Sequence, residues 1–201
     1  ASGIIATWTA RTGAMPGWQA ATPLPDARYR LAVAALDCSL LAVGGYGNDI
    51  HELALNRATR FDPATGAWTP VANKPTAAAN SAIAVVNGLV YVLGGYDPDA
   101  PEPFLDDLEV YDPASDHWEI APPLPIPLSG AAAAAYEGSI YLFGGSGPAG
   151  DSDATYRYDP QTQAWETRAP MPGGARIFAR AVSLGEYIYV AGGWPNIKGL
   201  W

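Results

Sequence analysis

Apolar residues occur along this chain in short runs separated by Gly, Pro, Asp and Ser. Many of the runs alternate apolar and polar positions, which predicts β-strands that are buried on one face. Helical periodicity is missing throughout. In the third quarter of the chain the pattern predicts four successive strands, at about 130–136, 139–143, 154–158 and 165–168.

Three sequence markers return with a nearly constant spacing. The first is a Gly pair that ends an apolar run, with successive pairs 50, 50 and 48 residues apart. The second is an aromatic residue followed by Asp-Pro, and the third is a Trp seven residues after that aromatic residue. The positions are Gly44, Gly45, Gly94, Gly95, Gly144, Gly145, Gly192 and Gly193 for the pairs, Phe61, Tyr111 and Tyr158 for the aromatic residues, and Trp68, Trp118 and Trp165 for the Trp. Trp18 belongs to the same series because it precedes Gly44 by 26 residues, as Trp68 precedes Gly94 and Trp118 precedes Gly144.

Each marker has a physical interpretation. A Gly pair at the end of a strand indicates positive φ or a close approach to neighbouring backbone. Asp-Pro starts a turn, because Asp bonds the backbone ahead and Pro presets φ. An aromatic residue and a Trp on successive strands can fill the space between adjacent sheets.

A Gly pair after an apolar strand, then Tyr-Asp-Pro, then Trp, at about 50 residues, resembles the kelch motif. The resemblance covers essentially the whole chain and implies an all-β propeller of four-stranded antiparallel blades around a central axis. Kelch units often have an Arg before the innermost strand. Arg28 and Arg176 match that position, whereas Ala78 and Leu128 depart from it.

The phase of the markers predicts four blades per chain. Three are continuous, and one is shared between strands from the two ends of the chain. The predicted blades are 28–71, 78–121, 128–168, and 177–193 together with 4–21, in one domain covering 1–201. Closure between the ends removes open strand edges. Two alternatives stay open: half of an eight-bladed ring formed by two chains, and a fragment of a larger propeller.

Composition and charge disfavour some classes of binding partner. The chain has 201 residues, 49% hydrophobic and 15% charged, with a net charge of −9. This acidic balance disfavours nucleic acid and anionic membrane surfaces as partners. The one cysteine, Cys38, lies in an apolar stretch and is predicted to be a buried, inert thiol.

Catalytic chemistry finds little support in the sequence. The two histidines, His51 and His117, are isolated, and no metal-ligand spacing is evident. An acidic loop from Asp97 to Asp107 lacks the spacing of a calcium loop and is interpreted as a solvated loop. We therefore expect no catalytic residues, no metal and no cofactor, and no enzymatic activity.

The best binding candidates precede the innermost strands, at the mouth of the axis. They are Arg28, Arg30, Asn80, Ser129, Arg176 and Arg180, near Ser81 and Phe178. Convergent Arg side chains suit a carboxylate or an acidic peptide. In the alternative interpretation, these Arg residues pair with neighbouring blades and hold the ring together.

The sequence is consistent with two alternative functions. The favoured one is a non-catalytic interaction module that presents loops to a protein or peptide, with a homodimer as a further option. The alternative is a carbohydrate-binding or sugar-acting kelch protein, for which Trp194 and Trp201 are the aromatic residues to inspect. The sequence does not identify the compartment, although an extracytoplasmic place within a larger protein is slightly favoured.

Overall fold

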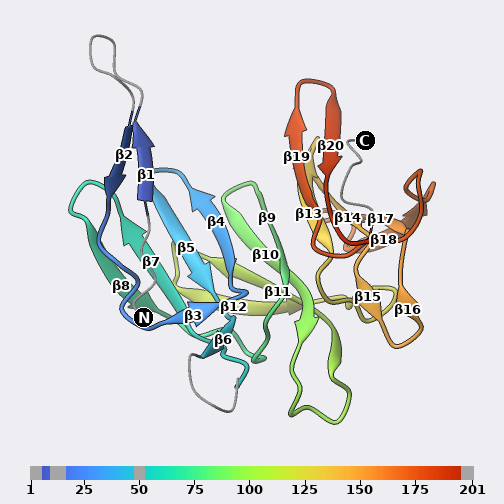
Figure 1. Cartoon of the computed structure of the whole chain (residues 1–201), viewed down its shortest axis with the longest axis horizontal. Helices are drawn as coiled ribbons and strands as arrows, with labels where there is room; N and C mark the ends of the chain where they lie inside the picture. Colours follow the sequence, from blue (N-terminus) through green and yellow to red (C-terminus); the bar gives the residue numbers. More distant parts are fainter. Residues whose placement is uncertain (1–5, 10–16, 48–52, 196–201) are drawn as a thin grey trace.

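The computed structural model describes residues 6–9, 17–47 and 53–195, and in these residues every regular element is a β-strand. Most strands are five residues long and are joined by tight turns. The all-β class and the four-stranded antiparallel blades predicted from the sequence are confirmed. Figure 1 shows the blades following one another from the first, in blue, to the last strands, in red.

Three complete blades are present, each with its strands hydrogen-bonded in chain order. The first contains β4 (Ala32–Leu36), β5 (Ser39–Val43), β7 (Ala58–Asp62) and β8 (Ala67–Val71). The second contains β9 (Ala82–Val86), β10 (Leu89–Tyr96), β11 (Phe104–Asp112) and β12 (His117–Ala121). The third contains β13 (Ala132–Tyr136), β14 (Ser139–Phe143), β17 (Thr155–Asp159) and β18 (Ala164–Arg168), close to the predicted ranges.

Two hairpins stand outside these blades. β1 (Ala6–Thr9) pairs with β2 (Gly17–Ala20), and β19 (Arg180–Leu184) pairs with β20 (Tyr187–Ala191). They are two separate two-stranded sheets in the described part of the chain. The shared fourth blade therefore stays a prediction, because its two halves are formed but are not paired with each other.

Short two-stranded ladders extend the loops on one face of the blades. β3 (Arg28–Tyr29) pairs with β6 (Tyr46–Gly47), and β15 (Ser146–Gly147) pairs with β16 (Gly150–Asp151). Isolated bridges, such as Ala79 with Tyr96, occupy the equivalent place in other blades. These ladders position the segments that lead into the innermost strands.

The Gly pairs join each blade to the next. A Cβ on Gly44 would lie 2.5 Å from the carbonyl oxygen of Ala78, which precedes the next innermost strand. The N–H of Gly45 donates to that same carbonyl at 2.8 Å, and Gly95 and Gly145 donate equivalently to Leu128 and Arg176. Glycine is thus required for backbone contact between blades, as well as for its positive φ.

Aromatic pairs fill the spaces between blades. Phe61 with Trp68, Tyr111 with Trp118, and Tyr158 with Trp165 have ring centroids 4.9, 5.0 and 5.0 Å apart. Each indole N–H of these Trp residues donates to a carbonyl of the preceding segment: Thr22 at 3.0 Å, Ala72 at 2.7 Å and Pro122 at 3.2 Å. The predicted roles of the aromatic and Trp positions between sheets agree with these contacts. The backbone of Trp18, on β2, is opposite that of Trp8 in the strand register.

One sequence expectation was wrong. Cys38 is exposed rather than buried. It lies in the tight turn between β4 and β5, next to Asp37, whose φ is +43°. The apolar residues after it form β5, so the apolar stretch begins beyond the thiol.

Candidate binding site at the axis mouth

The innermost strands of the blades, together with β19, line a central channel. Three consecutive cavities along it, of about 290, 350 and 390 Å³, have walls contributed by all four of these strands and the segments before them. Small side chains line most of its length, among them Ala32, Ala82 and Ala132. The cavity at the mouth, about 290 Å³, is the one with charged and aromatic side chains.

A belt of backbone hydrogen bonds forms the rim of the mouth. Arg30, Asn80, Gly130 and Phe178 stand at equivalent positions, each with φ between 55° and 66°. The N–H of Asn80 donates to the carbonyl of Arg30 at 3.0 Å, Gly130 to Asn80 at 2.9 Å, and Phe178 to Gly130 at 2.7 Å. Successive blades are therefore tied at their innermost corner, and the residues of the belt line the mouth.

Phe178 and Arg30 face each other across this rim. The guanidinium carbon of Arg30 lies 5.5 Å from the centre of the Phe178 ring, a cation–π arrangement. A Cβ on Gly130 would lie 2.9 Å from a ring carbon of Phe178, so the absent side chain leaves room for the ring. Phe178 remains 44% exposed, which leaves much of its ring open to a ligand.

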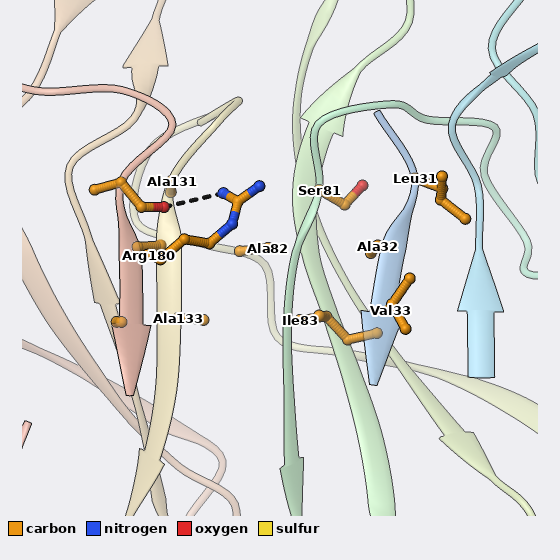
Figure 2. A pocket seen from close by; sticks show the side chains of 12 residues that line it. Leu31, Ala32, Val33, Ser81, Ala82, Ile83, Ala131, Ala133 and Arg180 are labelled. Atoms are coloured by element: carbon orange, nitrogen blue, oxygen red, sulfur yellow. Dashed lines mark hydrogen bonds between the residues drawn. The ribbon is translucent and has the colours of Figure 1, made fainter. Parts of the chain in front are cut away.

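Arg180 supplies a second positive charge, deeper in the channel. It is the first residue of β19, and its guanidinium donates to the carbonyl of Ala179 at 3.0 Å. Figure 2 shows its side chain pointing into the space bordered by Ala131, Ser81 and Leu31. Arg180 and Arg30 are both exposed, and within the described residues neither has a carboxylate within 4.0 Å.

Three of the six predicted site residues lie elsewhere. Arg28 is buried and donates to the carbonyls of Gly44 and Arg57 and to the Thr59 hydroxyl, with Asp26 at 3.3 Å. Burial lowers its pKa, and the charge of Asp26 opposes that shift. Arg176 is fully buried and donates to the carbonyl of Pro172. Arg28 thus bonds residues of the first blade and of the segment just before it, and Arg176 bonds the segment that follows the third blade.

Ser129 also lies outside the lining of the mouth. It is buried, and its backbone pairs with Ser146 at 2.8 Å in both directions. Arg30, Asn80 and Arg180 are the predicted residues that the structure brings together around the mouth, with Ser81 and Phe178 beside them. The spacing of the repeats places these residues at equivalent corners. That spacing did not indicate that Arg28 and Arg176, which directly precede Tyr29 and Ile177, are buried.

The described residues contain no group of three or more His, Cys, Asp or Glu side chains that could hold a metal ion. His117 is exposed at the start of β12, and His51 lies outside the described residues. Burial raises the pKa of Tyr91, Tyr111, Tyr136 and Tyr158, and none of these phenols lines the cavity at the mouth. The mouth thus offers positive charge, amide and hydroxyl groups and an aromatic face, which suit binding.

A second exposed aromatic residue is bridged to the backbone segment that leads into the mouth. Trp194 is 63% exposed, and its backbone forms a two-way bridge with Ile177, the neighbour of Phe178. The other aromatic residue that the sequence singled out, Trp201, lies outside the described residues.

These blades and their shared axis define the class of the protein as an all-β propeller. The kelch motif matches residues 27–75, 77–125 and 127–172, each range covering one of the three complete blades. The chain therefore belongs to the kelch-repeat family, whose repeats generally mediate interactions between proteins.

Solved structures support the same fold. The structure of YjhT matches with a TM-score of 0.79 and 22% sequence identity, covering 94% of this chain and 66% of that chain. This chain thus spans about two thirds of the length of YjhT. No curated protein matches the sequence. In the described residues no helix is long and apolar enough to cross a membrane.

Proposed function

We propose that this chain is a non-catalytic interaction module whose axis mouth binds an acidic segment of a partner protein. The observation that supports this proposal is the pair Arg30 and Arg180, which have no carboxylate partner among the described residues although the chain has a net charge of −9. A cationic mouth on an acidic protein steers negative ligands to one place. The general role of kelch repeats in protein binding agrees with it.

The size and chemistry of the mouth define the ligand more closely. A cavity of about 290 Å³ holds one or two side chains rather than a folded domain. A carboxylate can accept two parallel hydrogen bonds from one guanidinium, which favours Asp or Glu as the inserted residue. Asn80 and Ser81 can bind the adjacent peptide backbone, while the Phe178 ring covers its apolar part.

The test uses a fluorescently labelled peptide of alternating Glu and Gly, titrated with the protein at low and at physiological salt. We expect the double variant Arg30→Ala/Arg180→Ala to weaken binding by at least about tenfold, since charged hydrogen bonds contribute about 1.5–3 kcal/mol each. Arg168→Ala is the control for surface charge, because Arg168 is 48% exposed on the outer strand β18; it removes one positive charge, whereas the double variant removes two. Equal weakening in the control would refute a specific site.

A carbohydrate ligand is the second candidate, and the exposed aromatic rings support it. Phe178 and Trp194 lie on neighbouring backbone segments, 44% and 63% exposed. Such rings stack on the apolar faces of sugars. Titration of a panel of neutral oligosaccharides, followed by indole fluorescence, tests this candidate. A response that Trp194→Ala abolishes, with no response to the acidic peptide, would favour sugar binding over the proposal above.

A further inference from the structure

A cavity of about 470 Å³, here called the Arg60 cavity, lies on the first blade away from the axis mouth. It is lined by the turn after β4 and by one face of β5, β7 and β8, through Cys38, Ser39, Arg60, Asp62, Thr69 and Val71. Arg30 precedes β4 and Cys38 follows it, so the mouth and this cavity lie at opposite ends of that strand. The lining comes entirely from one complete four-stranded blade.

A buried serine holds the Arg60 guanidinium at this cavity. The Nε of Arg60 donates to the Ser39 hydroxyl at 2.9 Å, and that hydroxyl donates to the carbonyl of Leu36 at 3.1 Å. Because Ser39 is buried and its hydroxyl is oriented by Leu36, the Arg60 side chain is restrained before a ligand arrives. Among the described residues, the two terminal nitrogens of Arg60 have neither a hydrogen-bond acceptor nor a carboxylate within 4.0 Å.

The third blade shows what occupies the equivalent place. Arg157 there donates to the hydroxyl of Ser139 at 2.8 Å. Glu166 lies directly opposite Arg157 in the strand register and accepts a bond from its Nη1 at 3.3 Å. The residue opposite Arg60 in the first blade is Thr69, which has no carboxylate. The first blade thus has the guanidinium without the carboxylate that pairs with it in the third.

The aspartate beside Arg60 does not replace that carboxylate. Asp62 Oδ2 accepts a bond from the Thr65 hydroxyl at 3.0 Å. In the third blade the corresponding oxygen, Asp159 Oδ2, lies 3.5 Å from the Nη2 of Arg157 instead. The Asp62 carboxylate is therefore bound within its own turn, although the residue lines the cavity.

We propose that the Arg60 cavity binds the carboxylate of a ligand, in the place that Glu166 takes in the third blade. The terminal nitrogens of Arg60 donate two parallel bonds to the two carboxylate oxygens. The Thr69 hydroxyl offers a further donor, and Val71 gives an apolar wall for the carbon chain that carries the carboxylate. A free organic acid or an Asp or Glu side chain of a partner protein supplies this same group. The site is separate from the axis mouth and goes beyond the function proposed for it.

Cys38 reports directly on this cavity, because it is the one cysteine of the chain and its exposed side chain lines the cavity. Its thiolate displaces iodide from iodoacetate or iodoacetamide: an S–C bond forms as the C–I bond breaks, and the thiol proton passes to solvent. Only iodoacetate carries a carboxylate. The ratio of its rate to that of iodoacetamide therefore measures attraction of a carboxylate into the cavity, and changes in the thiolate fraction cancel.

Arg60→Gln should lower this ratio at least about threefold at low salt, because the carboxylate loses its cation. Arg157→Gln is the matched control. It removes the same charge at the equivalent position of the third blade, where the guanidinium is already paired, and should leave the ratio unchanged. Thermal unfolding verifies that both variants are folded. A ratio that Arg60→Gln leaves unchanged would overturn the proposal, and so would an equal decrease in the control.

Protection by added carboxylates tests binding itself. Succinate should slow the reaction of Cys38 with iodoacetamide, with a dissociation constant of about 1 mM or below, whereas neutral succinamide should not. Thr69→Glu should abolish this protection, because it places opposite Arg60 the carboxylate that the third blade has. Protection that survives in Thr69→Glu or in Arg60→Gln would overturn the proposal.

A capped peptide, acetyl-Gly-Glu-Gly-amide, separates the two sources of the carboxylate. Stronger protection by the peptide than by succinate would assign the site to a side chain of a partner protein, and the reverse order would assign it to a free organic acid. Protection by neither probe would overturn the proposal. The titration at the axis mouth uses the variant Arg30→Ala/Arg180→Ala, so either proposal can fail alone.

Discussion

At the scale of single residues, the recurring Gly, Asp and Trp each have one physical task, and equivalent copies of the repeat provide internal controls. Gly44 stands against the backbone of the next blade, whereas a Cβ on Gly192, at the equivalent position of the last hairpin, would meet no atom of the described residues within 4 Å. Both have positive φ, of 63° and 69°. A substitution at Gly192 therefore measures the free-energy cost of positive φ alone. The same substitution at Gly44 adds the cost of the close contact with the next blade.

Gly44→Ala should destabilise the fold more than Gly192→Ala. Both variants incur the cost of a left-handed conformation, about 1–2 kcal/mol. Gly44→Ala also displaces the carbonyl of Ala78 and weakens its bond from Gly45. We expect a further loss of about 2 kcal/mol in the free energy of unfolding, measured by urea denaturation. Equal losses would show that the blade contact adjusts without cost.

The Asp-Pro turns at Asp62 and Asp112 predict a pH effect with a definite sign. Bonds from the Ala64 N–H and the Thr65 hydroxyl lower the pKa of Asp62, and bonds from the Ser115 hydroxyl and the Ala114 N–H lower the pKa of Asp112. Because the folded pKa lies below the unfolded value of about 3.9, this stabilisation is present above that pH and is lost as the pH falls through the folded pKa.

The urea midpoint should therefore fall between pH 5 and pH 2. The double variant Asp62→Asn/Asp112→Asn should show a smaller fall, because each amide oxygen can keep the bond from the backbone N–H and the amide does not titrate. Asp99→Asn is a control, since Asp99 lies in the exposed acidic loop and its carboxylate accepts no bond in the described residues. An unchanged pH dependence in the double variant would contradict the assignment.

At the scale of elements, the interface between the first two blades contains a buried ion pair that its neighbours lack. Lys74 bonds Glu109 on β11, and each side chain is 1% exposed. The N–H of Thr76 donates to the other carboxylate oxygen of Glu109 at 2.7 Å. At the preceding interface the equivalent residues are Leu24 and Thr59, and the hydroxyl of Thr59 accepts a bond from Arg28.

Lys74→Leu should cost about 3–5 kcal/mol of unfolding free energy, because it leaves the Glu109 carboxylate buried without its cation. The double variant Lys74→Leu/Glu109→Thr installs the pair found at the preceding interface and should recover most of that loss. Thermal unfolding of the wild type, of the two single variants and of the double variant measures the coupling free energy between positions 74 and 109. A double variant no more stable than Lys74→Leu would show that the pair has a role the apolar version cannot replace.

At the scale of the whole molecule, each blade contacts its neighbours along the row, so stability depends on how many sides of a blade are covered. The β19–β20 hairpin is covered on one side, and Val182, Leu184 and Tyr187 are 61%, 68% and 65% exposed. Its counterparts in the second and third blades are buried between neighbours.

Amide hydrogen exchange should therefore be faster in β19–β20 than in the equivalent strands β13 and β14. The difference reports local opening, which requires less free energy where fewer apolar contacts are lost. The protein concentration is kept well below the dissociation constant of any dimer. The exchange rates of β19–β20 and of β13 and β14 should then differ by at least tenfold, which corresponds to about 1.4 kcal/mol of opening free energy. Equal protection under these conditions would mean that the hairpin is covered by the rest of its own chain.

The sequence by itself determined the blade and its repetition. The spacing of Gly pairs, Asp-Pro turns and Trp residues is set by contacts inside one blade and with the next, and local patterns record such contacts directly. Arg30, Asn80 and Arg180 could be placed at the axis mouth for the same reason, since each occupies the corner before an innermost strand.

Only the tertiary structure decided which of those corner residues face the mouth and how the two terminal hairpins lie. Arg28 and Arg30 are two residues apart, yet the first is buried against Gly44 and Thr59 and the second lines the cavity. The positive φ of Arg30 turns the chain between them, and a pattern of residue types does not encode that turn. The relation of β1–β2 to β19–β20 likewise depends on the angle between successive blades, which accumulates over the whole row and has no signature in any one repeat.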